Sequence, residues 1–509
     1  MTGTQMAKDD YHARAQLEAA LLRGRAPAAG PRGGPQAGPG TDSRSGAQDP
    51  RTGTGSPARA ADPAAHPLPP SRAAADGSLA GPDGATRFRA SLAQEGMWRS
   101  LRGGPGSTPP LLTGGLRLRG PLDTGALEDA WNDVVARHDN LRSTLRQEDG
   151  RLNQVVAGSL RLPVPVTGLA IEDFGRFTRQ EVDRPLDLAE GPLAGLRLLR
   201  LGADDHIAFL LVHHIIGDGR TLEVLVRDLS AFYLARTTGT TVPLPRLPVR
   251  YGEFAAAHRA RTEGPRGAEV GDYWLRRLAG AEPAELPTDR APSGRPAALG
   301  GFLDVPMPAD VLRRLTEFAR ARRTTLHTVG LAAFQALLAR ESGQRDISVR
   351  VPVSYRDGTE LQDLVADFSN DVVVRTDLSA NPAFGELVDR VHHDTALDFA
   401  HHDLPPHLLE PRMDTPGLLD RLFHVQFTAE REFDVAVTVG ELRAEPIMPP
   451  DPYVSRPLSL RLRHGDGSAR CLAAFALDRF SEERVARFVA DYHDLVGELT
   501  GHPDRRVLG

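Results

Sequence analysis

The strongest pattern of apolar and polar positions predicts a strand, a turn and a helix in succession. Residues 207–216 form an almost unbroken apolar run, which is typical of a strand buried on both faces. Gly217, Asp218 and Gly219 break this run, as glycines do in a tight turn. Beyond the turn, apolar residues fall on one face of a helix: Leu222, Leu225, Val226, Leu229, Phe232 and Tyr233.

Two adjacent histidines, His213 and His214, lie near the end of the predicted strand. Successive side chains of a strand point to opposite faces, so the two rings cannot both enter one cavity. We therefore expect one ring to be structural and the other to be available for chemistry.

Residues 1–85 have a different pattern from the rest of the chain. Residues 11–25 carry a short apolar stripe at helical spacing, whereas the chain from residue 26 to about 85 is dominated by Pro, Gly, Ala, Ser and Arg. Such a segment has too little apolar area to repay the entropy of ordering, so we predict a disordered extension with one short helix. That helix is interpreted as a docking element for a partner protein or, with more weight, as a fraying terminus without a role.

Residues 86–509 alternate strand and helix patterns, which predicts an α/β fold. Residues 264–301, rich in Pro, Gly and Ala, are expected to connect an N-terminal lobe (86–263) to a C-terminal lobe (302–509). In the second lobe we expect helices over 311–321 and 326–338, a strand over 346–353, a hairpin over 458–477, and a final helix from its N-cap Ser481 to about Leu499.

Composition narrows the functions available to the chain. The net charge of −6 and pI near 6.3 give no reason to expect nucleic acid or an anionic membrane as a partner. No apolar stretch is long enough for a membrane span and no secretion signal is recognised, which favours a cytoplasmic location. Lys8 is the only lysine, so the folded part offers none for a Schiff base, a P-loop or adenylation. The single Cys471 excludes an internal disulfide and is expected to be a packing residue.

The segment from His213 to Gly219 reads HHIIGDG and matches the pattern HHxxxDG. It resembles the signature of the condensation domains of nonribosomal peptide synthetases, which are related to chloramphenicol acetyltransferase. Companion motifs resemble those of the family and follow in its order: SLAQEGMW at 91–98, RHDNLRSTL at 137–145, YGEFA at 251–255, VPVSYR at 351–356, VADFSN at 365–370 and HHDLP at 401–405. The resemblance covers roughly residues 88–509, and without a recognisable carrier motif or adenylation segment it suggests a free-standing condensation enzyme.

The resemblance implies a fold and a reaction. The fold would have two chloramphenicol-acetyltransferase-like lobes in a V-shape with an active-site tunnel between them. The reaction would transfer an acyl or aminoacyl group from the phosphopantetheinyl thioester of an acyl or peptidyl carrier protein to a small-molecule amine or hydroxyl, forming an amide or ester in natural-product biosynthesis. No bound cofactor or metal is expected. Two alternatives stay open: a coenzyme A-dependent acyltransferase of the same superfamily, and a non-catalytic recruitment domain of the same fold.

The resemblance also assigns roles to residues. His214 would be the active histidine, acting as a base or mainly orienting the nucleophile, and His213 would pack behind it. Asp218 would point away and pair with an arginine, by position Arg356 first and Arg142 second. Gly219 would let the backbone pass close to the tunnel, where its N–H could contact the thioester or oxyanion.

Two other features leave alternatives. A second histidine pair, His392–His393, lies in a helical pattern close to His401, His402 and His407, and we favour a solvated helix face over a zinc site there. Arg220 stands where family members often have Trp, and the sequence does not decide between a role at the tunnel and a surface position.

Overall fold

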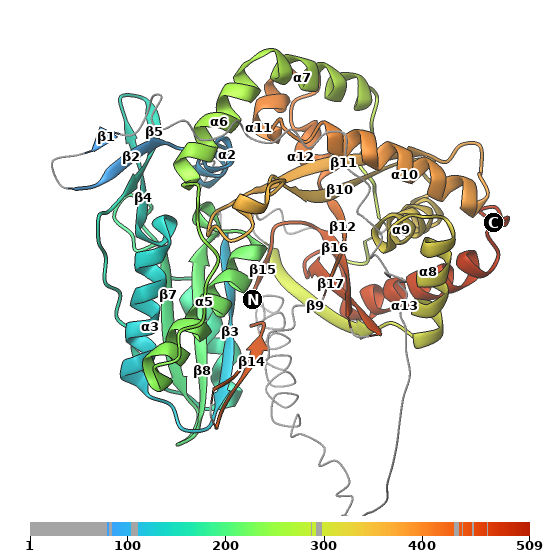
Figure 1. The fold of residues 1–509 in the computed structure, drawn as a ribbon. Helices are drawn as coiled ribbons and strands as arrows, with labels where there is room; N and C mark the ends of the chain where they lie inside the picture. Colours follow the sequence, from blue (N-terminus) through green and yellow to red (C-terminus); the bar gives the residue numbers. More distant parts are fainter. Residues whose placement is uncertain are drawn as a thin grey trace, which may run out of the picture.

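The computed structural model describes residues 79–80, 84–102, 110–286, 288–291, 298–431, 437–439, 441–449, 452–465 and 467–509. The predicted helix over residues 11–25 and nearly all of the predicted extension lie outside these residues. The described chain has a mixed α/β architecture, with two groups of strands and helices side by side (Figure 1). None of its helices is long and apolar enough to cross a lipid bilayer.

A six-stranded sheet forms the centre of the N-terminal lobe. Its strands, in spatial order, are β13 (Val437–Val439), β14 (Leu442–Ile447), β3 (Leu111–Arg119), β8 (Asp205–His213), β7 (Ala194–Arg200) and β6 (Val166–Gly168). The apolar run becomes β8, which pairs on both sides, with β3 and with β7. Ala208 and Leu210 join the core under α3 (Thr124–Arg137) and α5 (Gly219–Thr238). Phe209 points to the other face, where α4 (Phe174–Val182) covers it. Burial on both faces explains why β8 has no polar side.

A second, smaller sheet lies in the same lobe. Its strands are β1 (Leu79–Ala80), β2 (Thr86–Arg89), β5 (Arg151–Val156) and β4 (Ser143–Glu148). Helix α2 (Leu92–Leu101) follows β2 directly in the sequence. Helix α6 (Tyr251–Glu263) contacts β2 in the fold.

A seven-stranded sheet forms the centre of the C-terminal lobe. Its strands, in spatial order, are β11 (Ser369–Asp377), β10 (Asp346–Ser354), β12 (Val425–Arg431), β16 (Leu458–Gly465), β17 (Ser468–Ala476), β9 (Ala298–Pro306) and β15 (Tyr453–Val454). It shares one core with α8 (Ala309–Ala321), α9 (Leu326–Ser342), α10 (Phe384–Ala400) and α13 (Glu482–Gly501). The predicted strand, hairpin and three helices of this lobe are confirmed. Ser481 caps α13 as expected, because its side chain accepts from the Arg484 N–H at 3.2 Å.

Two segments join the lobes in ways that the sequence pattern did not indicate. β14 comes from the second half of the chain but pairs with β3 of the first lobe, and its Leu442 and Ala444 enter that lobe's core. Conversely, α7 (Pro265–Arg277) lies in the predicted connection and buries Val270 and Trp274 in the core of the second lobe. The predicted boundaries at 264 and 301 included neither feature and stay a prediction.

Candidate active site

Strand β8 ends at His213, three residues before the end of the apolar run, because the His213 side chain binds the backbone that follows it. Its Nδ1 accepts the Ile215 N–H at 3.0 Å, and residues His214–Ile216 form a single 3₁₀ turn. An Nδ1 that accepts a hydrogen bond carries no proton, so this ring is neutral. Burial, and then the neighbouring His214, lower the pKa of His213 to about 4, in agreement with the hydrogen bond. With 1% of its surface exposed, His213 is a support within the fold.

The side chain of His214 is 29% exposed, and its Nδ1 faces the carboxylate of Asp367. The distance from Nδ1 to Asp367 Oδ2 is 3.7 Å, slightly beyond a hydrogen bond. Burial works against protonation of the ring, but the negative charge of Asp367 outweighs it and raises the pKa of His214 to about 9. The direction of this shift favours a protonated ring beside the Asp367 carboxylate.

Asp367 is held in place by its neighbours and is only 2% exposed. Its Oδ1 accepts from the Ser369 N–H at 2.9 Å and from the Ser369 hydroxyl at 2.5 Å, which leaves Oδ2 toward His214. The sequence interpretation placed Asp367 within a motif but gave it no role. A carboxylate between Ala366 and Phe368, in a buried apolar stretch, was the signal that could have identified it.

Asp218 lies at the start of α5 and serves as its N-cap. Its Oδ1 accepts the Thr221 N–H at 3.0 Å, and the Thr221 hydroxyl in turn accepts the Asp218 N–H at 3.0 Å. Gly217 permits this tight turn, since a Cβ there would lie 2.9 Å from the Thr221 side chain. The turn predicted from sequence is therefore a capping box.

The structure pairs Asp218 with Arg356, the first of the two predicted partners. The guanidinium approaches both carboxylate oxygens, with Nε at 3.1 Å from Oδ2 and Nη2 at 3.0 Å from Oδ1. Arg356 also donates to the carbonyl of Leu364 at 2.9 Å and lies over the Phe368 ring at 4.4 Å. Both charged groups are buried, and the pair joins the end of the first lobe's β8 turn to the second lobe.

Arg142, the second predicted partner of Asp218, lies elsewhere. It donates to Asp139 at 2.8 Å and to the carbonyl of Val135 at 3.2 Å, so it fixes the 3₁₀ turn Asp139–Arg142 to the end of α3. The prediction that Arg142 could support the site through Asp218 is wrong, because this local turn already uses its guanidinium.

Gly219 is the first residue of α5, and a Cβ added there would meet no protein atom within 4 Å. The N–H groups in the first turn of a helix have no partner within the helix. Open space beside such a group is what a substrate oxygen would need. The expected contact of the Gly219 N–H with the acyl group stays a prediction.

Gln94 supports the turn after His214, a role that the sequence interpretation missed. Its Nε2 donates to the Ile215 carbonyl at 3.1 Å, while its Oε1 accepts the Ser91 N–H that begins α2. The SLAQ sequence of the first companion motif therefore positions the turn that carries His214.

Tyr251, on α6, connects the two halves of the site. Its hydroxyl donates to the Asp367 carbonyl at 2.7 Å and lies 2.9 Å from the Ser91 hydroxyl, with 3% of the residue exposed. We expect Tyr251→Phe to lower the free energy of unfolding by about 1–3 kcal/mol, because the buried carbonyl loses its donor. Urea unfolding followed by circular dichroism measures this. Tyr453→Phe, which removes a hydroxyl bonded to Asp183 in an exposed setting, is the control, and equal losses in both variants would contradict the assignment.

The structure also gives the positions of the other residues that the sequence analysis singled out. His392 and His393 are exposed on α10. Within the described ranges, no group of three or more His, Cys, Asp or Glu side chains could hold a metal ion. The Arg220 side chain is 42% exposed and pairs with Glu223. Cys471 is buried beside His493, and burial raises the pKa of its thiol to about 12.

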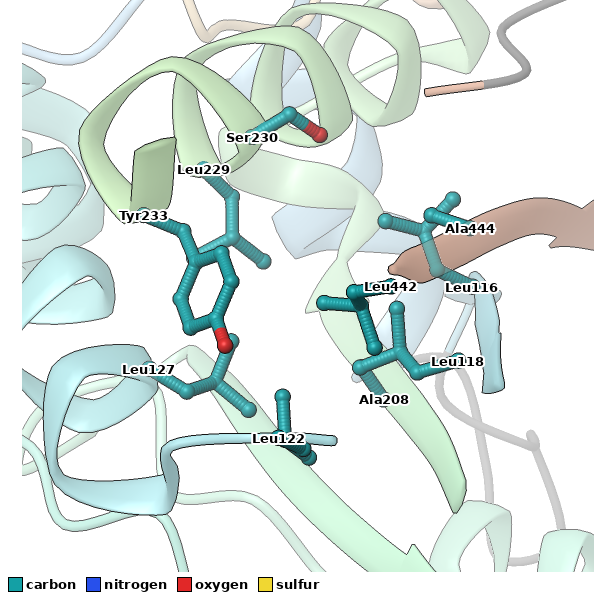
Figure 2. Close-up of a pocket in the computed structure, with 10 residues that line it drawn as sticks. All are labelled: Leu116, Leu118, Leu122, Leu127, Ala208, Leu229, Ser230, Tyr233, Leu442 and Ala444. Atoms are coloured by element: carbon teal, nitrogen blue, oxygen red, sulfur yellow. The ribbon is translucent and has the colours of Figure 1, made fainter. Parts of the chain in front are cut away.

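A small cavity lies in the N-terminal lobe between α5, α3, β3 and β14 (Figure 2). It is lined mainly by leucines, among them Leu116, Leu118 and Leu229, and its volume of about 20 Å³ leaves room for about one water molecule. Neither His214 nor Asp367 lines it. This cavity is a packing gap and not a substrate site.

Comparison with known proteins agrees with this arrangement. A family model, the Condensation domain, matches residues 85–508. The chain belongs to the condensation-domain family. One of the linear gramicidin synthase proteins of Brevibacillus parabrevis is 32% identical over an alignment of 440 residues, which covers 83% of this chain and 8% of that protein. The condensation domain described here therefore spans under a tenth of that relative's length.

Two solved structures are also similar to this condensation domain. The X-domain in its complex with OxyB from teicoplanin biosynthesis superimposes with a TM-score of 0.73 and 25% identity, covering 83% of this chain and 95% of that one. The SgcC5 protein from Streptomyces globisporus gives a TM-score of 0.68 and 27% identity, covering 82% of this chain and 100% of that one.

Proposed function

We propose that this condensation domain transfers an acyl or aminoacyl group from the phosphopantetheinyl thioester of a carrier protein to an amine or hydroxyl acceptor. The observation that carries the proposal is the setting of His214: a partly exposed ring, held against a buried carboxylate, at the end of a rigid central strand. A group fixed in this way can act on a substrate delivered to it without moving the fold.

The other residues of the motif hold the backbone around His214 in place. His213 is neutral and buried, and it caps the turn that presents His214. Asp218 and Arg356 hold the start of α5, where a Cβ added at Gly219 would meet no protein atom within 4 Å. We propose that this N–H donates to the thioester oxygen, which becomes negative as the nucleophile attacks. The substrate arrives on the phosphopantetheine arm of its carrier, so the proposal includes carrier proteins as partners and no cofactor bound to this chain.

Recruitment of another protein is the second candidate function. It is favoured by the likeness to an X-domain whose structure was solved together with OxyB. In that case the HHxxxDG residues would keep the fold together and no product would form. The intact set of His214, Asp218 and Arg356 favours the catalytic proposal, because a recruitment surface needs no exposed histidine paired with a buried carboxylate.

Mass spectrometry of acylated carrier proteins tests the proposal. The chain is mixed with a panel of acyl and aminoacyl carriers, with the matching coenzyme A thioesters, and with amine and alcohol acceptors. We expect loss of the acyl group from a carrier together with a new conjugate, both dependent on the chain. Turnover from coenzyme A thioesters alone would favour the coenzyme A-dependent acyltransferase, and binding of carriers or other proteins without any turnover would favour recruitment.

A further inference from the structure

Two arginines of the C-terminal lobe lie beside one phenylalanine ring. The guanidinium carbon of Arg350 is 5.8 Å from the centroid of the Phe423 ring, and that of Arg456 is 5.4 Å from it. Arg350 comes from the middle of β10, and Arg456 comes from the segment between β15 and β16. We call Arg350, Arg456 and Phe423 the arginine cluster. Because like charges repel, two guanidinium groups this close to one ring need negative partners.

Arg350 has a negative partner, whereas Arg456 has only a screened one. Nη2 of Arg350 lies 2.6 Å from Asp371 Oδ1, so the charge of that carboxylate is taken up. Nη1 of Arg456 lies 3.6 Å from Asp420, whose side chain is 80% exposed, and water and salt screen such a pair. Within the described part of the chain, the arginine cluster therefore keeps close to one positive charge that no sheltered carboxylate balances.

The Arg456 side chain is also short of hydrogen-bond acceptors. It is 21% exposed, and its Nε is buried without a hydrogen-bond partner among the described residues. Burial, and then the charge of Arg350, lower the pKa of Arg456 to about 10, so the group is still a cation at neutral pH. A buried donor without an acceptor and a sheltered cation without an anion both cost free energy. An oxyanion placed beside Arg456 would relieve both costs.

The register of β11 connects the arginine cluster to the candidate active site. Side chains alternate along a strand, so Ser369 and Asp371 point to the same face of β11, and both are partly exposed. Ser369 binds the Asp367 carboxylate that faces His214, whereas Asp371 binds Arg350. Two residues of a strand span about 7 Å, so the arginine cluster begins a short distance along β11 from the site. A substrate held at His214 reaches it by extending along this face.

We propose that the arginine cluster binds an oxyanion that the substrate carries several bonds away from its reacting atom. This inference rests on the proposed function, because it describes a substrate of that reaction. A guanidinium presents parallel N–H donors that fit the oxygens of a carboxylate or a phosphate, and Arg456 provides such a group. The oxyanion has two possible sources: a carboxylate of the donor acyl group or the acceptor, or the phosphate of the pantetheine arm.

Ligand-observed NMR titrations test this subsite without any turnover. The probes are matched in pairs that differ in one oxyanion: S-carboxyalkyl pantetheines against their amides, ω-amino acids against their amides, and 4′-phosphopantetheine against pantetheine. In at least one pair we expect the charged member to have a Kd about 10- to 100-fold lower, the size of a hydrogen bond to a charged group. The pair that shows the preference identifies the source of the oxyanion. A wild-type chain without a preference in any pair would overturn the inference.

Three variants assign the preference to Arg456. Arg456→Gln removes the cation, and we expect the two members of the pair to bind equally. Arg456→Lys keeps a cation but loses the planar fork, so it should retain part of the preference. Arg313→Gln removes the same charge from an exposed arginine of α8 and should retain all of it. A preference that survives in Arg456→Gln, or that falls as far in Arg313→Gln, would also overturn the inference.

Competition between the two members of the preferred pair relates the subsite to the reaction. They are offered together in the acyl-transfer assay, as thioesters where they are donors. We expect kcat/KM to favour the charged member by about 10- to 100-fold in the wild-type chain and by much less in Arg456→Gln. Equal turnover of both members would overturn the inference and leave the proposed function intact. A binding preference without product from any donor would uphold the subsite and count against the proposed function alone.

Discussion

We expect that replacing His214 with alanine will lower the rate of acyl transfer by about 10²- to 10⁴-fold. The His214 ring is partly exposed, and its Nδ1 faces the buried carboxylate of Asp367. In the proposed reaction its loss removes a contact to the reacting acyl group. A loss of this size corresponds to about 2.7–5.5 kcal/mol of transition-state stabilisation. The measurement is product formation from the productive carrier and acceptor pair, under single-turnover conditions, by mass spectrometry.

The matched control for this variant is His393→Ala. His393 belongs to a second histidine pair of the chain, but it is exposed on α10 and lies outside the proposed site. Its rate should stay close to the wild-type rate. Because His214→Ala also leaves Asp367 without its cation, circular dichroism must first show that the variant is folded at the assay temperature. A folded variant with wild-type turnover would remove His214 from the mechanism.

Local patterns predicted the elements that carry the site, and the reason is physical. β8 is buried on both faces, so its apolar run is continuous, and the break at Gly217 is needed because a side chain there would collide with Thr221. Both signals depend only on neighbours in sequence. The predicted strand ended at residue 216, three residues after the observed end of β8 at His213. The hydrogen bond from the Ile215 N–H to the His213 ring ends the strand, and the pattern of apolar positions does not indicate such a bond.

Contacts between distant parts of the chain were beyond the reach of the sequence pattern. His214 and Asp367 lie on different lobes, and β14 returns to the first lobe from the far end of the chain. Arg142 and Arg356 were both plausible partners for Asp218, since a sequence does not give a distance between motifs. The fold selects Arg356 because β10 ends beside the start of α5, whereas the turn after α3 uses the charge of Arg142 locally.

Replacing Arg356 with methionine should cost about 3–5 kcal/mol in the free energy of unfolding. The substitution keeps most of the apolar bulk over Phe368 but leaves Asp218 buried with an uncompensated charge. Activity should fall with it, since Asp218 caps the helix that begins at the Gly219 N–H. Urea unfolding and turnover are measured on the same preparation.

A double variant distinguishes the buried charge from the loss of packing. Asp218→Asn keeps an oxygen that can accept the Thr221 N–H, so α5 stays capped when the charge is removed. Added to Arg356→Met, it should therefore recover part of the lost stability, because no unpaired charge is left inside. Arg236→Met, which breaks an exposed bidentate pair with Asp133, should cause a much smaller loss. If the double variant is no more stable than Arg356→Met alone, the stability lost in Arg356→Met comes from packing and not from the uncompensated charge. The buried ion pair would then not be the contact that fixes the start of α5 to the second lobe.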